Sequence, residues 1–103
     1  MNAAFAKASD YGVEIVFADL GDWGVDELRS EYDPEGPVIR LNSRVAQQLT
    51  PEELGHFVTM AVGHELYHHR ERLGEVAVIA DRRERELAAN AFASDLLRLS
   101  SGA

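Results

Sequence analysis

The stretch GHELYHH, residues 63–69, places His64 and His68 four positions apart with Glu65 between them. On an α-helix, residues four apart lie on one face, so the two imidazoles can converge on one metal ion. Glu65 projects about 100° round the same helix, where it can reach a metal-bound water without binding the metal. Zn²⁺ held by three protein groups keeps a fourth position for water and lowers the pKa of that water to about 7. The spacing therefore predicts a hydrolytic zinc site on a helix.

The same spacing also arises by chance on surface helices. The chain has four histidines, and His56 and His69 are expected to have ordinary surface or half-buried roles. A zinc site requires two further features, which are a helix around the motif and a third ligand elsewhere in the chain.

Length and composition indicate a single domain over residues 1–103. The 103 residues are 46% hydrophobic and 27% charged, which is ordinary for a small globular protein and leaves no room for a second catalytic domain. The chain has no cysteine, so disulfides and thiolate ligands are excluded. A metal would have to be bound by histidines and carboxylates.

The charge is strongly acidic. The formal net charge is −8, and residues 1–36 carry nine acids against Lys7 and Arg29. Such a surface would repel phosphate backbones, so direct binding of nucleic acid is not expected. The first residues, MNAAFAKASDYG, contain no apolar run long enough for a signal peptide or membrane helix, and a cytoplasmic location without membrane contact is expected.

The first half of the chain predicts an N-terminal helix and a small sheet. An alanine-rich stretch followed by Gly12 predicts a helix over residues 2–11. Alternating Val13, Ile15 and Phe17 indicate a strand. Turn signals then separate two more expected strands, giving an antiparallel meander over residues 13–20, 28–32 and 37–42. Trp23, in the first loop, is assigned no role.

The second half has helical periodicity. Asn42 or Ser43 can cap a short helix that ends near Leu49. Thr50, with Glu53 three residues on, forms a capping box that predicts a long helix over residues 51–73, with Gly74 as its stop. The positions expected to form the buried or metal-facing stripe of this helix recur every three or four residues, namely Leu54, Phe57, Ala61, His64 and His68.

A second helix is expected to supply the third ligand. Asp81 and Glu84 form another capping box, and the helix should run to Ser100. Glu71 and Glu75 lie on or just past the histidine helix and cannot easily reach a metal on it. The candidates are therefore Glu84 and Glu86, of which Glu86 shares a face with small alanines that allow close helix packing. The alternative for Glu86 is an ordinary solvated carboxylate in an arginine-rich stretch.

Asn90 lies one helical turn beyond Glu86. From this position its side-chain oxygen could accept the N–H of a ligating histidine and fix the orientation of that ring. The alternative is an amide on the surface.

HELYH at residues 64–68, followed by ELAANAFASDLL at 86–97, resembles the ImmA/IrrE family of zinc metallo-endopeptidases. Members carry a His-Glu-x-x-His helix and then a Glu-x-x-Ala-Asn-x-Phe-Ala helix, which is a gluzincin plan in a compact, zincin-like α+β domain. The resemblance implies that His64, His68 and Glu86 bind zinc, that Glu65 is the general base, and that Asn90 matches the asparagine of the second motif.

The resemblance also implies a regulatory protease that cleaves a helix-turn-helix repressor or another protein partner. Extended substrate is expected to pair with an edge strand, for which residues 37–42 are the candidate. One alternative is a non-catalytic, zinc-stabilised binding module for a regulator or toxin, and another is a zinc hydrolase acting on non-peptide substrates. Glu65 favours a hydrolase, because a structural site has no use for a general base beside an open metal position. Tyr67 and His69 are expected to point away from the metal.

Overall fold

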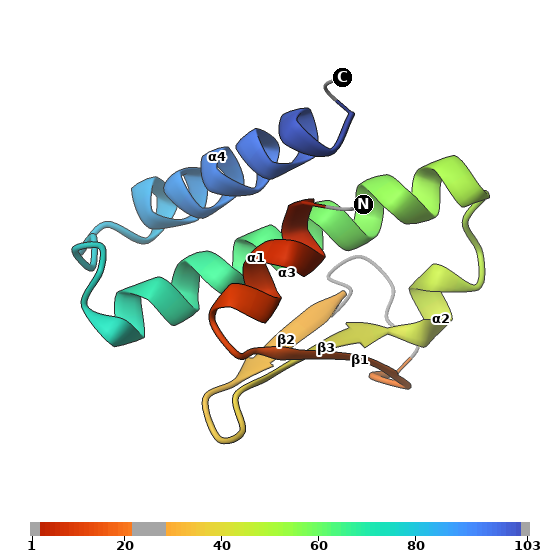
Figure 1. Cartoon of the computed structure of the whole chain (residues 1–103), viewed down its shortest axis with the longest axis horizontal. Helices are drawn as coiled ribbons and strands as arrows, with labels where there is room; N and C mark the ends of the chain where they lie inside the picture. Colours follow the sequence, from red (N-terminus) through yellow and green to blue (C-terminus); the bar gives the residue numbers. More distant parts are fainter. Residues whose placement is uncertain (1–2, 22–28, 102–103) are drawn as a thin grey trace.

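The computed structural model describes residues 3–21 and 29–101, which form an α+β fold as the sequence predicted (Figure 1). Within these ranges the elements in chain order are α1 (Ala3–Asp10), β1 (Glu14–Ala18), β2 (Ser30–Asp33), β3 (Val38–Asn42), α2 (Ser43–Ala46), α3 (Pro51–Leu73) and α4 (Arg82–Ser101). None of these described helices is long and apolar enough to span a membrane. Trp23 lies outside the described residues.

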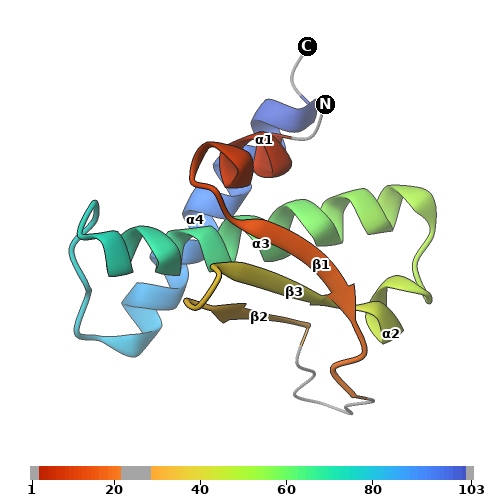
Figure 2. The same ribbon diagram turned by 60° about the horizontal axis from the view of Figure 1, so that its bottom comes forward.

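The sheet is mixed, so the predicted antiparallel meander is wrong in its strand directions. The strand order is β1-β3-β2, with β1 parallel to β3 and β2 antiparallel to it (Figure 2). The central strand β3 carries Ile39 and Leu41, both fully buried, whereas β1 has no buried residue. The most buried strand therefore takes the middle of the sheet. Residues 37–42 consequently cannot offer the free edge that was expected of them.

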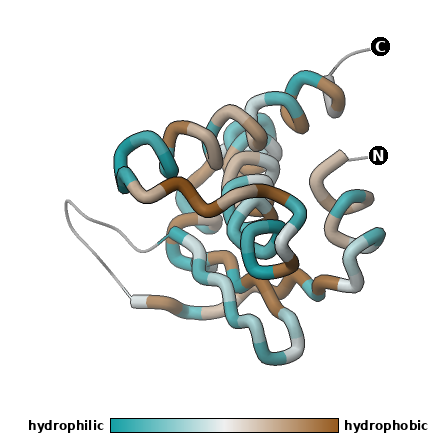
Figure 3. Tube along the Cα trace, turned by 90° about the vertical axis from the view of Figure 1, so that its left-hand side faces the viewer, coloured by the Kyte–Doolittle hydropathy of each residue, from teal (hydrophilic) through white to brown (hydrophobic). Residues whose placement is uncertain are grey.

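Helix α3 packs across the sheet through Val58, Val62 and Leu66, which join Ile39 and Leu41 in the buried core. The stripe predicted for this helix lies next to this core-facing row of residues and does not coincide with it. Of its members Phe57 is buried, while Leu54, Ala61, His64 and His68 are only half-buried. The helix thus has two adjacent faces, one on the core and one bearing the histidines. Hydrophobic and hydrophilic segments alternate along the helices in Figure 3, as expected for helices buried on one side.

The predicted ends of α3 are confirmed. The Thr50 side chain accepts the Glu53 N–H at 3.2 Å, and the Glu53 carboxylate accepts the Thr50 N–H at 2.9 Å, which is a complete capping box. Gly74 ends the helix with a φ of 78°, a left-handed conformation that suits glycine. The predicted short helix is also present as α2, capped by Asn42. At α4, the Asp81 carboxylate accepts the Glu84 N–H at 2.9 Å.

Helices α3 and α4 approach each other closely at Gly63. A Cβ atom on Gly63 would lie 2.6 Å from the Cα of Ala93, and Ala89 and Ala93 on α4 are fully buried. A side chain at position 63 would meet backbone that cannot move aside without shifting a helix. Gly63 therefore sets the distance between the helix that carries the histidines and the helix that carries Glu86.

We expect Gly63→Ala to destabilise the protein by about 1–3 kcal/mol, the usual scale of overpacking. Gly55→Ala on the same helix is the matched control, because a Cβ there meets nothing within 4 Å. That control should stabilise by roughly 0.5–1 kcal/mol through helix propensity. Urea unfolding followed by circular dichroism measures both, and equal stabilisation by the two substitutions would contradict the close-packing account.

Candidate metal centre

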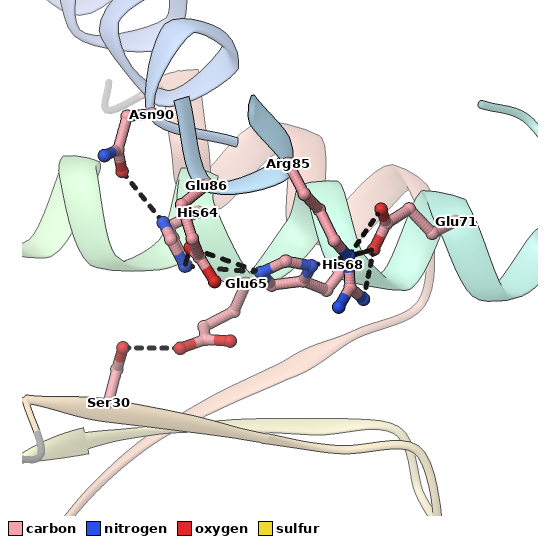
Figure 4. A network of polar contacts seen from close by, with 8 residues as sticks. All are labelled: Ser30, His64, Glu65, His68, Glu71, Arg85, Glu86 and Asn90. Carbon is pink, nitrogen blue, oxygen red and sulfur yellow. Dashed lines mark hydrogen bonds and ion pairs between the residues drawn. The ribbon is translucent and has the colours of Figure 1, made fainter. Parts of the chain in front are cut away.

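Three potential ligand atoms converge between α3 and α4 (Figure 4). The Nε2 atoms of His64 and His68 lie 3.3 Å apart, and Oε2 of Glu86 lies 2.9 Å from the first and 4.0 Å from the second. Two ligand atoms bound to Zn²⁺ at 2.0–2.1 Å in a tetrahedron are separated by ~3.3 Å. The three residues are half-buried and form the one group in the described residues able to hold a metal ion.

The other nitrogen of each histidine is already engaged. Nδ1 of His64 lies 2.9 Å from Oδ1 of Asn90, and Nδ1 of His68 lies 2.8 Å from Oε1 of Glu71. Both partners are acceptor oxygens, so each Nδ1 carries the hydrogen. Nε2 is then the atom of each ring that can offer a lone pair, and both Nε2 atoms lie near the Glu86 carboxylate. This arrangement fits a metal ion held by the three residues.

Glu71 is the partner of His68 that the sequence reasoning missed. Its buried carboxylate also accepts hydrogen bonds from Arg85, at 2.9 Å from Nε and 2.8 Å from Nη2. The hydrogen bonds from Arg85 outweigh the effect of burial and lower the pKa of Glu71 to about 2. The group is thus a carboxylate that can only accept. Its signal in the sequence was its spacing of three from His68, which places it beside that ring.

Glu65 lies next to the ligand cluster without belonging to it. Its Oε2 accepts the hydroxyl hydrogen of Ser30 at 2.7 Å, so the side chain extends from α3 toward the first residue of β2. In Figure 4 the carboxylate lies between the two histidines and the sheet. The sequence predicted that Glu65 lies beside the candidate ligands. The structure shows in addition that Ser30 of the edge strand β2 orients the Glu65 carboxylate.

The remaining candidates lie away from the cluster. Glu84 is exposed at the start of α4, and the structure brings Glu86 rather than Glu84 to the histidines. His69 is buried between α3 and the sheet, where it hydrogen-bonds to the Tyr32 hydroxyl and where burial lowers its pKa. Tyr67 packs against Phe92. Neither Tyr67 nor His69 belongs to the ligand cluster, although the Tyr67 ring makes an edge contact with the His68 ring.

A groove of about 840 Å³ opens beside the cluster. The end of the groove at the ligand cluster is lined by Ser30, His64, Glu65 and Asn90. The wall along α2 and the first half of α3 includes Val45, Leu49, Phe57, Met60 and Ala61. The volume lies within the range of small-ligand and substrate sites. The ligand cluster therefore borders a largely apolar groove through His64.

Comparison of the chain with models of protein families, with curated proteins and with solved structures found no match. The candidate metal site therefore rests on the geometry of His64, His68 and Glu86.

We expect the purified protein to hold about one divalent metal ion per chain, as three-ligand zinc sites do. Glu86→Ala should lose most of that metal, because it removes the candidate ligand that α4 supplies. Glu84→Ala, two residues away and exposed, is the matched control and should retain it. Elemental analysis after dialysis measures both. Loss of metal from Glu84→Ala with retention by Glu86→Ala would show that the assigned ligand is wrong.

Proposed function

We propose that this protein is a zinc-dependent endopeptidase of the ImmA/IrrE type. The observation that carries the proposal is the convergence of His64, His68 and Glu86 beside a carboxylate, Glu65, that does not join them. A purely structural zinc site is normally closed by four protein ligands. Here the described residues supply three candidate ligands, of which His64 lines an accessible groove. A metal held by these three would keep a fourth position for water, as catalytic zinc sites do.

Each residue then has a distinct task. Bound Zn²⁺ would supply a water of lowered pKa and polarise the substrate carbonyl. Glu65 takes a proton from the attacking water and returns it to the leaving amine. Ser30 holds Oε2 of Glu65 and so directs Oε1 for that transfer. Asn90 keeps the hydrogen of His64 on Nδ1, which leaves Nε2 free to bind metal.

The edge strand β2 takes the place of residues 37–42 as the proposed docking site for an extended substrate. The Asn42 N–H donates to the Arg29 carbonyl at 2.8 Å, so Arg29 faces β3. Because hydrogen bonding alternates along an antiparallel pair, the backbone groups of Ser30 and Tyr32 face away from β3. A peptide paired there would run past Glu65, whose hydrogen-bond partner is the first residue of the strand.

The groove and the charge narrow the class of substrate. The apolar wall formed by Leu49, Phe57 and Met60 suits a large apolar side chain next to the scissile bond. The formal charge of −8 would attract a basic protein. We propose limited cleavage of a basic partner, such as a helix-turn-helix repressor. Incubating the zinc-loaded protein with a helix-turn-helix repressor and, separately, with casein tests this selectivity. Rapid, unselective digestion of casein with no preferred site in the repressor would contradict it.

Glu65→Gln should retain zinc and fold, but should lose peptide hydrolysis by at least about 10²-fold, the lower scale of general base catalysis. The amide keeps a side-chain oxygen for Ser30 but cannot take up the proton. Zinc content, circular dichroism and turnover of a cleaved peptide are the measurements. Comparable turnover by wild type and mutant would remove Glu65 from the mechanism. A wild type that binds zinc and its partner but cleaves nothing would favour the non-catalytic binding module.

Met60→Trp should fill the groove and lower kcat/KM about 10-fold or more for peptides with a large apolar residue at the cleavage site, a usual scale for pocket discrimination. Peptides with a small residue there should lose less. Val78→Trp, at an exposed position outside the groove, is the matched control. Cleavage of a peptide library, with products mapped by mass spectrometry, measures the preference. An unchanged preference in Met60→Trp would show that this wall does not contact substrate.

A further inference from the structure

A chain of three side chains links the two helices behind the ligand cluster. Arg85 of α4 binds Glu71 of α3 with both its Nε and Nη2 atoms, and Glu71 accepts the Nδ1 hydrogen of His68. The Glu71 side chain is 3% exposed, against 39% for Arg85. The carboxylate is thus enclosed between a ligand histidine and a guanidinium that reaches the surface (Figure 4).

Because Arg85 is the neighbour of Glu86 in the sequence, its contact with Glu71 also affects the position of Glu86. Arg85 immediately precedes Glu86, and both lie in the first turns of α4. Its two-point contact with Glu71 resists both sliding and rotation of α4 along α3, because a guanidinium fork and a carboxylate fit in one plane. The same contact that orients His68 therefore also holds the start of the helix that carries Glu86.

We propose that Arg85 and Glu71 form a positioning pair that sets the geometry of the metal site from both helices at once. The inference rests on the proposed metal site and extends it to two residues that bind no metal. Glu71 holds the His68 ring with its hydrogen on Nδ1 and its lone pair on Nε2. Arg85 keeps the Glu71 carboxylate in place and, through the backbone, presents Glu86 to the two imidazoles.

Each member needs the other. Without Arg85, Glu71 would be a buried charge with only a histidine N–H as partner, and it would tend to turn toward solvent. Without Glu71, His68 would lose the acceptor that selects its tautomer. The two residues should therefore act as one unit, and the effect of removing both should be smaller than the sum of the separate effects.

The experiment compares Glu71→Ala, Arg85→Gln, the double variant and Arg85→Lys with wild type. Arg82→Gln is the matched control, because it removes an exposed arginine from the same stretch. Zinc affinity is measured by chelator competition, the visible spectrum of the cobalt-substituted protein reports ligand geometry, and thermal unfolding of the metal-free protein reports stability. All binding measurements are made well below the unfolding temperature of every variant.

We expect Glu71→Ala and Arg85→Gln each to weaken zinc binding by about 10–100-fold, the scale for partners of ligating histidines. The double variant should be no weaker than Glu71→Ala, Arg85→Lys should recover part of the loss, and the cobalt spectrum should change in both single variants. Arg82→Gln should match wild type. Lower unfolding temperatures with unchanged zinc affinity and cobalt spectra would overturn the inference and leave a merely structural ion pair. Absence of zinc binding by wild type would overturn the proposed metal site itself, and the positioning role with it.

Discussion

The candidate metal site is shaped by an electrostatic constraint. The Nε2 atoms of His64 and His68 and the Oε2 atom of Glu86 lie 2.9 to 4.0 Å from one another. Groups of this kind repel unless a cation lies among them. The surrounding contacts hold them there nevertheless. Asn90 and Glu71 accept hydrogen bonds from the Nδ1 atoms of His64 and His68. The close approach of the helices at Gly63 brings α4 near enough for Glu86 to reach the two histidines. A site assembled in this way is organised to receive a metal ion.

The parts of the fold that local chemistry determines were predictable from the sequence. The capping box of Thr50 and Glu53 and the stop at Gly74 gave the bounds of α3, since these signals lie within a few residues of the helix ends they specify. The spacing of His64 and His68 likewise predicted a shared helix face. Glu86 was predictable as a candidate because small alanines mark the packed face of α4.

The parts that depend on contacts between distant elements were not predictable. Alternation identifies a strand but does not state the direction of its neighbour, and so the parallel pairing of β1 with β3 was missed. The central place of β3 followed from that pairing. The role of Glu71 was hidden for a similar reason, because its partner Arg85 lies fourteen positions further along the chain, on another helix. Ser30 became significant only when β2 was placed beside Glu65.

The features relevant to the proposed catalysis meet at Glu65. The ligand cluster lies on one side of it, the edge strand β2 on another, and the apolar groove ends beside it. In the proposed function, a chain of 103 residues combines a metal site, a proton acceptor and a surface for extended peptide in a small space. Selectivity for one protein partner would then come from charge and from the groove, since backbone pairing along a strand discriminates little between side chains.

The most direct test of the central claim is the tautomeric state of the two histidines, measured by nitrogen–proton NMR correlation of the side chains in zinc-loaded protein. The account predicts that His64 and His68 both carry hydrogen on Nδ1 and that both Nε2 atoms show the shift changes of metal coordination on titration with zinc. Hydrogen on Nε2 of either ring in the zinc-loaded protein, or Nε2 signals that zinc leaves unchanged, would contradict it.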